Sequence, residues 1–586
     1  MEKKYYTAER NVQIVIALLK ANGIKRVIAS PGTTNMTFVG SIQNDPFFEI
    51  FSSVDERSAA YLACGMAAET GEPVVLSCTG ATASRNYMSG LTEAYYRKLP
   101  VLAITSHRGD QQIGHLLDQQ IDRRQRPADI VMESVVVPMV KDATDEKYCT
   151  IEANKAILAL KLNGGGPAHI NLFTSYNSDF SVQTLPTVRA IKRHTVYDDL
   201  PELPSGKRVA IFIGAHKNFS PKETEIIDNF CLAHNAVVFC DHTSNFYGKS
   251  AAHMQIVFGQ VNYTSPLKSV DLLIHIGEVT GDVYRMAPQQ VWRVSEDGAL
   301  RDMFGCLTDV FMMSERQFFE HYTPHGYVPT SDYLDDCRRE YDEFISKIPE
   351  LPFGNIWMAQ QMHDRLPISS ELHMGIYNSL RSWNFFTLPK EVKAQCNVGG
   401  FGIDGGVSTM IGASLANPNR LIFGVFGDLA FFYDMNVLGN RHVGNNVRLM
   451  LINNGCGAEF RLSVHLCEKN FGEEAAPFMA AAGHFGNKSP QLIKHYAEDL
   501  GYEYLTASSK DEFKQMMERF ITPEVTDRPM IFEVFTDKQD ESDALEMLLN
   551  MKSDSGTVIK NNLRKVAGQV LGGKGVKALK TILNKS

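Results

Sequence analysis

The sequence predicts an α/β protein made of three doubly wound domains whose sheets are mainly parallel. Short apolar segments, such as residues 74–79 and 421–426, alternate with longer segments of helical pattern along most of the chain. Many of these apolar segments end in Gly, Asp or Asn, which commonly begin the loop after a strand. This alternation of strand and helix is typical of parallel sheets that carry helices on both faces.

Two segments divide the alternation into three groups. Residues 181–206 contain prolines and mixed charge, and residues 333–352 form a charged helical segment that ends in prolines. The expected organisation is a first domain at 1–180, a linker at 181–206, a central α/β domain at 207–332, a helical linker at 333–352, a third domain at 353–540 and a basic amphipathic tail at 541–586.

The first group places an acidic residue where a strand gives way to a helix. Residues 24–29 predict a strand that leads into the Pro31-Gly32 turn, and a second short strand runs into Asp55 and Glu56. An alanine-rich helical segment follows, so the amides at its N-terminus would orient the Glu56 carboxylate. The alternative is that Glu56 only stabilises the start of that helix.

Composition favours a soluble enzyme. The chain has 586 residues, 44% of them hydrophobic, which is enough for three cores, and its net charge of −9 gives no reason to expect nucleic acid as a partner. Ten cysteines without a Cys-x-x-Cys pair predict reduced thiols and a cytoplasmic location. The N-terminal segment lacks a long apolar core, so we expect an amphipathic first helix, and no apolar run is long enough to span a membrane.

The end of the chain differs from the rest. Residues 559–586 carry seven Lys or Arg and no acid, with apolar residues near helical spacing. Such a segment either lies on an anionic membrane surface, which would make the protein peripheral to the inner membrane face, or is a frayed terminal extension.

Two oxygen-bearing side chains in the third group form the most informative pattern. Asp428 follows the apolar run LIFGVFG, and Asn453-Asn454 end the apolar run VRLMLI, 26 positions further on from Asp428 to Asn454. This spacing allows one helix and a return to a parallel neighbouring strand, so both side chains would reach the carboxyl edge of the sheet, where ligands bind. A carboxylate, an amide oxygen and a backbone carbonyl form an incomplete hard shell that Mg²⁺ completes with phosphate oxygens.

This Gly-Asp to Asn-Asn spacing resembles the cofactor motif of thiamine diphosphate (ThDP) enzymes. The resemblance implies that Asp428, Asn454 and the backbone carbonyl of Cys456 hold Mg²⁺ against the cofactor diphosphate. It implies that Glu56 bonds the cofactor pyrimidine, which lets the cofactor's own nitrogen remove its C2 proton, and that Ile403 props the cofactor in a bent shape. The first and third domains would then bind pyrimidine and diphosphate. Further cofactor contacts are expected at Pro31, Gly32, Thr79, Gly80, Gly427 and Leu429.

Several longer segments narrow the resemblance. SPGTTN, VDERSAAYLACGMA, FGIDGGVST and GDLAFFYDMN are together similar to the 2-succinyl-5-enolpyruvyl-6-hydroxy-3-cyclohexene-1-carboxylate synthases of the menaquinone pathway. The similarity covers about residues 10–540.

Three arginines of that family have no counterpart here. Thr34, Val398 and Trp383 stand in their places, and such arginines resemble clamps for substrate carboxylates, for which a planar bidentate donor is hard to replace. We therefore expect substrates other than 2-oxoglutarate and isochorismate. Glu459 stands where the family has an apolar residue and is a candidate acid/base, the alternative being a solvated carboxylate. The candidate substrate residues are Thr34, Arg108, His115, Gln119, Ser379, Arg381, Trp383 and Phe460, of which Arg108 and Gln119 match the family.

The predicted activity is ThDP- and Mg²⁺-dependent decarboxylation of a 2-oxoacid. The enamine that results would be protonated, or ligated to an unknown acceptor. The resemblance implies a homodimer or homotetramer in which Glu56 of one subunit faces Asp428 of another. Two alternatives remain: a true menaquinone-pathway synthase in which Arg381 or Arg461 replaces the missing arginines, and a ThDP-fold protein that binds the cofactor without catalysis.

Overall fold

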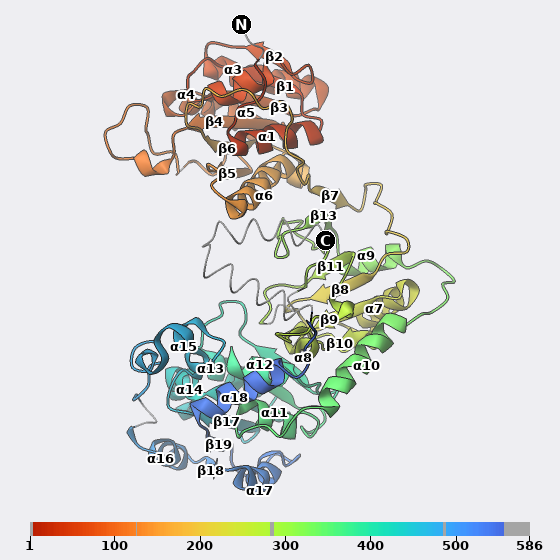
Figure 1. Cartoon of the computed structure of the whole chain (residues 1–586), viewed down its shortest axis with the longest axis vertical. Coiled ribbons are helices and arrows are strands. Elements are labelled where there is room, and N and C mark those ends of the chain that lie inside the picture. The colour runs from red at the N-terminus through yellow and green to blue at the C-terminus, as the bar shows by residue number, and fades with distance from the viewer. Residues whose placement is uncertain (1–3, 125, 282–285, 485–487, 556–586) are drawn as a thin grey trace. The chain divides into compact units, whose positions relative to one another are not determined.

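The computed structural model describes residues 4–124, 126–281, 286–484 and 488–555 (Figure 1). The chain forms two compact units, one made of residues 1–200 with 297–312 and the other of the remaining residues. The strands of the described residues pair in parallel and form α/β domains with helical crossovers, as predicted. The basic segment 559–586 lies outside the described residues.

The first unit is built on a six-stranded sheet in the order β2-β1-β3-β4-β6-β5. Its strands are β1 (Arg26–Ala29), β2 (Glu49–Ser52), β3 (Val74–Thr79), β4 (Val101–His107), β5 (Glu133–Val137) and β6 (Ala168–Phe173). Its helices are α1 (Arg10–Ala21), α2 (Met36–Ile42), α3 (Glu56–Thr70), α4 (Ala81–Asn86), α5 (Met88–Tyr96) and α6 (Ala143–Ala159), with short 3₁₀ turns η1 (Asp110–Gln112) and η2 (Leu162–Gly164).

Alternate residues of this sheet enter two separate cores. On β3, Val75 packs with α1 and α6, whereas Val74 and Leu76 pack with α3 and α5 on the opposite face. A strand with both faces buried reads as a continuous apolar run, because successive side chains point to opposite faces. The first unit is therefore doubly wound.

The first helix expected from sequence is α1, and most of it is buried. All nine residues from Asn11 to Leu19 of α1 are buried, because the helix is packed between α2, α6 and the sheet. Its polar members donate hydrogen bonds: Asn11 Nδ2 donates to the carbonyl of Phe173 at 2.7 Å, and Gln13 Nε2 donates to that of Thr7 at 2.7 Å.

The predicted linker at 181–206 contains a strand. β7 (Lys192–Thr195) pairs in parallel with β13 (Leu307–Met312), and both belong to the first unit, which consists of residues up to Leu200 together with Asp297–Met312. The short polar sequence KRHT of β7 carries no apolar run, which explains why its pairing has no signal in the sequence.

The second unit contains two sheets. In its first sheet the order is β10-β9-β8-β11-β12, and in its second it is β15-β14-β16-β17-β19-β18. The strands are β8 (Val209–Ile213), β9 (Val237–Cys240), β10 (Ala251–Ala252), β11 (Leu272–Ile276), β12 (Gln290–Val294), β14 (Glu371–Met374), β15 (Lys393–Cys396), β16 (Ile422–Gly427), β17 (Val447–Asn453), β18 (Glu503–Ala507) and β19 (Met530–Phe535).

Helices cover both of these sheets (Figure 1). They are α7 (Pro221–His234), α8 (Gln255–Phe258), α9 (Glu315–Tyr322), α10 (Asp332–Ser346), α11 (Asn355–Met362), α12 (Asn378–Asn384), α13 (Gly406–Ala416), α14 (Asp428–Asp434), α15 (Leu466–Phe471), α16 (Leu492–Asp499), α17 (Lys510–Phe520) and α18 (Lys538–Leu549). α10 is the charged helix expected near 333–352, and α18 extends from the predicted third domain into the predicted tail.

Candidate active site

Asp428 and Asn454 emerge at the same edge of the second unit's larger sheet. β16 and β17 are parallel neighbours, with Gly427 opposite Ile452, so their carboxyl ends coincide. Asp428 is the first residue of α14, directly after β16, and Asn454 directly follows β17. The spacing in the sequence therefore correctly predicted that Asp428 and Asn454 follow neighbouring parallel strands.

The Asp428 carboxylate is buried and has no cationic partner among the described residues. Asp428 is 4% exposed. Its Oδ1 accepts a hydrogen bond from the Leu429 amide at 2.8 Å, and its Oδ2 accepts one from the Gly455 amide at 2.8 Å. Burial raises the pKa of Asp428 to about 7, and no cationic side chain of the described residues pairs with it. Gly455 has a φ of +73°, a left-handed conformation that glycine adopts without strain and that turns its amide toward the carboxylate.

The two asparagines of the pair have different surroundings. Asn453 is buried and donates from Nδ2 to Glu533 Oε1 at 2.7 Å, while the Tyr504 hydroxyl donates to Glu533 Oε2 at 2.7 Å. Asn454 is half-buried, and its amide oxygen receives only a long contact of 3.4 Å from the Cys456 amide and one of 3.9 Å from its thiol among the described residues. Asn453 thus ties β17 to β19, whereas the Asn454 oxygen is left available.

These groups fit a Mg²⁺ ion. Asp428 offers a carboxylate that lacks a counter-charge, and Asn454 offers an amide oxygen, which are ligands that Mg²⁺ prefers. The described residues contain no cluster of three or more His, Cys, Asp or Glu side chains in metal-binding positions. An ion here would therefore depend on Asp428, Asn454, a backbone carbonyl such as that of Cys456, and oxygens supplied by a ligand.

The neighbouring loops are held in place around this point. Asp434, at the end of α14, accepts from the Ser408 amide at 2.5 Å and from the Ser408 hydroxyl at 2.6 Å, which fixes α14 to the start of α13. Leu429 is half-buried beside Gly457, and Ile403 is half-buried in the segment between β15 and α13. Both candidate cofactor residues are thus partly accessible.

Arg381 and Glu459 form a bidentate ion pair in this unit. Arg381 Nη1 donates to Glu459 Oε2 at 3.0 Å, and Nη2 donates to Oε1 at 2.9 Å. Glu459 lies in the 3₁₀ turn η6 (Ala458–Arg461) after β17, and Arg381 lies on α12 after β14. Because the two side chains neutralise each other, neither carries an uncompensated charge. Arg461 is likewise committed, to Glu473 at 2.8 Å and Glu468 at 2.9 Å.

The other predicted substrate residues of this unit differ in accessibility. Phe460 is 38% exposed. Ser379 and Trp383 are 2% and 0% exposed, so the Trp383 indole belongs to the core and does not face a ligand in this structure.

In the first unit, Glu56 is the first residue of α3, as expected. Asp55 caps the helix by accepting from the amides of Arg57 at 2.8 Å and Ser58 at 3.3 Å, which leaves the half-buried Glu56 carboxylate with one long contact of 3.5 Å from Asn86 Nδ2. Because Asp55 takes the capping role, the carboxylate of Glu56 is not needed to start the helix.

The predicted pyrimidine loops contact each other. A Cβ on Gly32 would lie 2.0 Å from Thr79 Cγ2, so only glycine fits there. Pro31 is exposed, Thr79 is half-buried and Gly80 is buried. Glu56 and these loops belong to the first unit, and Asp428 belongs to the second.

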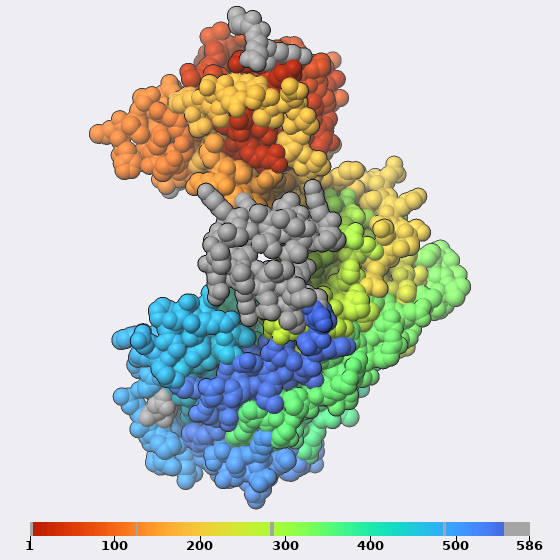
Figure 2. Space-filling model, in the orientation of Figure 1, coloured from red at the N-terminus to blue at the C-terminus, as the bar shows by residue number. Residues whose placement is uncertain are grey.

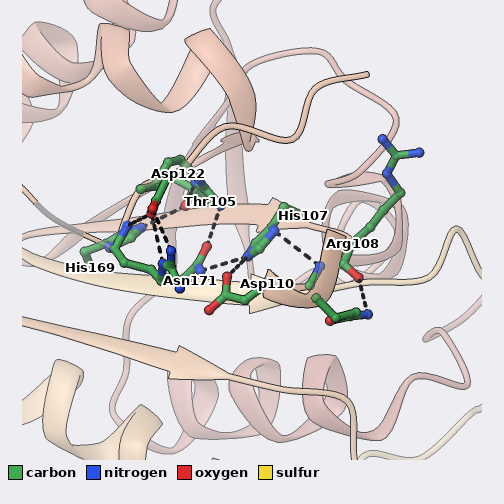
Figure 3. A network of polar contacts seen from close by, with 11 residues as sticks. Thr105, His107, Arg108, Asp110, Asp122, His169 and Asn171 are labelled. Carbon is green, nitrogen blue, oxygen red and sulfur yellow. Dashed lines mark hydrogen bonds and ion pairs between the residues drawn. The ribbon is translucent and has the colours of Figure 1, made fainter. Parts of the chain in front are cut away.

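The segment after β4 carries Arg108, His115 and Gln119. Arg108 Nη2 donates to the Asp118 carbonyl and lies 3.2 Å from Asp118 Oδ1. Figure 3 shows the Arg108 guanidinium pointing away from His107 and Asn171. His115 and Gln119 are exposed, and Leu116 between them is fully exposed, on an orange segment that projects from the first unit in Figure 2. Thr34 is instead 3% exposed, and its hydroxyl has no hydrogen-bond partner among the described residues.

A polar network at the carboxyl end of β4 was not predicted (Figure 3). Arg123 donates from Nη1 to Thr105 Oγ1 and from Nη2 to Asn171 Oδ1, both at 2.6 Å. Asn171 Nδ2 lies 2.8 Å from His107 Nε2, and Thr105 Oγ1 lies 2.8 Å from His169 Nε2. Burial, followed by the nearby Arg123, lowers the pKa of His107 to about 4. These residues come from separate segments, and no local pattern marks them.

Comparison with known proteins agrees with the predicted fold and family. Residues 10–125 match the family model described as "Thiamine pyrophosphate enzyme, N-terminal TPP binding domain". Two relatives are named 2-succinyl-5-enolpyruvyl-6-hydroxy-3-cyclohexene-1-carboxylate synthase. The one from Bacteroides thetaiotaomicron is 30% identical over 567 residues, which covers 92% of this chain and 98% of the relative. The one from Phocaeicola vulgatus is 30% identical over 577 residues with the same coverage.

A solved structure also matches. It is the Rhodococcus jostii RHA1 thiamine diphosphate-dependent 4-hydroxybenzoylformate decarboxylase, with 14% identity, a TM-score of 0.39, and coverage of 90% of this chain and 99% of that chain.

The three α/β domains and the matched N-terminal domain define a protein of the thiamine diphosphate enzyme class. Within that class the chain belongs to the family of the 2-succinyl-5-enolpyruvyl-6-hydroxy-3-cyclohexene-1-carboxylate synthases, as its full-length relatives show. None of the helices in the described parts of the chain combines the length and apolar character needed to cross a membrane.

Proposed function

We propose that this protein is a ThDP- and Mg²⁺-dependent enzyme that removes carbon dioxide from a 2-oxoacid. The remaining acyl carbon then takes up either a proton or an acceptor molecule in place of the lost carboxylate. The observation that carries this proposal is the buried Asp428 carboxylate, which lacks a cationic partner and lies at the sheet edge beside the available Asn454 oxygen.

Each predicted residue then has a definite task. Asp428, Asn454 and the Cys456 carbonyl would hold Mg²⁺ and, through it, the cofactor diphosphate. Glu56 would bind the pyrimidine through its carboxylate. The carboxylate is available for this role because its single contact, with Asn86 Nδ2, is long. When bound, ThDP supplies the nucleophilic carbon that attacks the 2-oxoacid and accepts the electrons released with carbon dioxide.

The substrate is expected to carry less negative charge than the dicarboxylic 2-oxoglutarate. Thr34 and Val398 are neutral and buried, and the nearby candidates to replace the missing arginines, Arg381 and Arg461, are paired with carboxylates of the chain itself. A guanidinium already bound to a carboxylate in bidentate geometry must give up that pair before it can bind a substrate carboxylate. Glu459 is a candidate proton donor only if the Arg381 pair opens.

A second candidate is the synthase activity for which the relatives are named. It is favoured by 30% identity over nearly the full length of both relatives. It requires that Arg108, or an arginine released from an ion pair, takes over the binding of the substrate carboxylates.

A panel of 2-oxoacids distinguishes the two candidates. Carbon dioxide release would be measured with ThDP and Mg²⁺ for monocarboxylic 2-oxoacids and for 2-oxoglutarate, the latter also with isochorismate. We expect a monocarboxylic 2-oxoacid to have the highest kcat/KM. Efficient formation of the synthase product from 2-oxoglutarate and isochorismate would reject the first candidate and establish the second.

Substitution of Glu459 tests whether the Arg381–Glu459 pair sets the preference for a substrate of lower negative charge. Glu459→Gln removes the competing carboxylate, so kcat/KM for 2-oxoglutarate relative to that for pyruvate should rise roughly tenfold, the lower end for a charge-assisted contact. The exposed Glu474, changed to Gln, is the matched control and should leave the ratio unchanged. An unchanged ratio in Glu459→Gln would show that the pair does not set the preference.

We propose further that the protein is a cytoplasmic homodimer or larger homo-oligomer. All ten cysteines are free thiols, as expected for a reducing compartment. Exposed apolar side chains occur in both units, including Tyr61 and Leu62 on α3, 48% and 50% exposed, and Phe478, 92% exposed. Such residues are typical of surfaces that are covered by another subunit.

A further inference from the structure

The first unit contains a small cavity lined by three arginines. Its volume is about 40 Å³, and it lies between the segment of α4 and α5, strand β4 and the chain around residues 123–131. Apolar side chains such as Leu91 and Val131 form part of its wall. The lining residues with polar side chains are Ser84, Arg85, Tyr87, Thr105, Arg123, Arg126 and His169. No acidic residue is among the described residues that line it.

Arg123 is held in this cavity by neutral groups. Its two hydrogen bonds, each 2.6 Å, go to the Thr105 hydroxyl and the Asn171 amide oxygen, and it forms no ion pair with a described residue. A buried guanidinium ordinarily has a carboxylate or phosphate partner, because desolvation of its charge is costly. The Thr105 and Asn171 contacts fix the plane of the guanidinium but do not neutralise it.

The acids near this cavity form no ion pair with Arg123 or Arg126 among the described residues, although Asp110 acts on Arg123 electrostatically at longer range. The Asp122 carboxylate is engaged by Arg124 at 2.7 Å, and Arg85 donates only to the backbone carbonyl of Asp122. Asp110 lies 3.5 Å from His107 Nε2. Glu133 acts on Arg126 only at longer range, and the Arg126 side chain makes no hydrogen bond or ion pair with the described residues.

His169 does not neutralise the positive charge of the arginines either. Its ring is buried between the hydroxyls of Thr105, 2.8 Å from Nε2, and Ser134, 2.7 Å from Nδ1. Burial, then Arg123 and Arg126, lower the pKa of His169 to about 3, so the imidazole is neutral at physiological pH. The described residues that line the cavity therefore carry positive charge and no negative charge.

We propose that this cavity is a binding site for one small oxyanion, either inorganic phosphate or the carboxylate of a small organic acid. Arg123 and Arg126 are the charged donors. The Ser84 hydroxyl donates to the Ala81 carbonyl at 2.8 Å and the Thr105 hydroxyl contacts Arg123 and His169, so both belong to the wall of the site. A planar guanidinium matches two oxygens of either group, and a cavity of about 40 Å³ admits a carboxylate or a single phosphate but not a nucleotide. The site lies within the first unit, and Arg123 lies close to Gly80, an expected cofactor contact.

The test is calorimetry on the full-length protein without ThDP. Sodium phosphate and sodium acetate would be titrated separately against a chloride background at constant ionic strength, which identifies the preferred oxyanion. We expect one anion per chain to bind. Arg126→Gln, at an exposed side chain that the fold does not need, should weaken binding roughly tenfold or more, as should Arg123→Gln.

Arg97→Gln is the matched control. Arg97 is exposed at the end of α5, pairs with Glu93 of the same helix at 3.3 Å, and does not line the cavity, yet its substitution changes the charge of the first unit equally. It should bind the anion as the unmodified protein does. No binding of either anion, binding unchanged in Arg126→Gln, or equal loss in Arg97→Gln would each overturn the proposal.

Discussion

At the scale of single residues, Asp428 links the fold to the expected chemistry. Its carboxylate is fixed by two backbone amides and buried, and burial raises its pKa to about 7 from an ordinary value of 3.8. A protonated carboxyl group is a poor ligand for Mg²⁺, whereas the ionised form gains the counter-charge that it lacks.

The raised pKa predicts a pH-dependent metal affinity. Mg²⁺ binds the ionised form, so its affinity should fall about tenfold for each pH unit below about 7 and level off above that value. Calorimetric titration of Mg²⁺ in the presence of ThDP, at a series of pH values, measures this dependence. An affinity that stays constant from about pH 5 to pH 8 would show that Asp428 is not a ligand.

Some site residues are recognisable in the sequence and others are not, for a physical reason. Asp428 and Asn454 are visible because the length of a helical crossover fixes their spacing, and Glu56 is visible because a strand leads directly into its helix. The Asn453–Glu533 bond and the Arg123–Asn171 bond join residues 80 and 48 positions apart. Such pairs form only when particular strands become neighbours in the sheet, and no local sequence pattern indicates which strands will be neighbours.

At the scale of elements, the larger sheet of the second unit is held together at its site edge by a side-chain bond. Glu533 on β19 is 1% exposed and accepts from Asn453 on β17 and from Tyr504 on β18. Burial raises the pKa of Glu533, and the Asn453 and Tyr504 bonds act in the opposite direction. The three strands are thus joined beside the cofactor loops.

Removal of the Asn453 amide should destabilise this edge. Asn453→Ala leaves one oxygen of the buried Glu533 without a partner, which costs about 1–3 kcal/mol of unfolding free energy. Denaturant unfolding compares it with Asn445→Ala, an exposed residue just before β17. Equal unfolding free energies for the two variants would show that the bond contributes nothing to stability.

Element prediction succeeded where burial is continuous. β4 and β17 are entirely buried and read as apolar runs, so their positions followed from sequence. β7 has no buried residue, and its pairing with β13 spans more than a hundred positions, so a composition rich in proline and charge suggested a linker instead. The burial of α1 on all sides likewise depends on α2 and α6, which only the folded unit brings together.

At the scale of the whole molecule, the predicted cofactor residues are divided between two units. Glu56 and the Gly32–Thr79 contact belong to the first, and Asp428 and Asn454 to the second. In the proposed homodimer, one site combines Glu56 of one subunit with Asp428 of the other.

Complementation between inactive variants tests this arrangement. Glu56→Gln and Asp428→Ala should each lack activity, since a proton-transfer group contributes about 10²–10⁴-fold to the rate. Mixed dimers of the two variants contain one intact site, so equal mixing after refolding should restore about a quarter of the activity of the unmodified protein. Recovery should not occur when Asp428→Ala is refolded alone. If the mixture of dimers also stays inactive, each site is formed within one chain.

Calorimetric affinity for ThDP in the presence of Mg²⁺ measures whether Asp428 holds the metal that binds the cofactor. The unmodified protein should bind ThDP only when Mg²⁺ is present, and Asp428→Ala should abolish binding, because the diphosphate would then face Asn454 and backbone dipoles without a cation. Asp499→Ala, at an exposed position on α16 of the same unit, should bind as the unmodified protein does. Equal ThDP affinity in Asp428→Ala and the unmodified protein would show that Asp428 does not hold a metal ion that the cofactor needs.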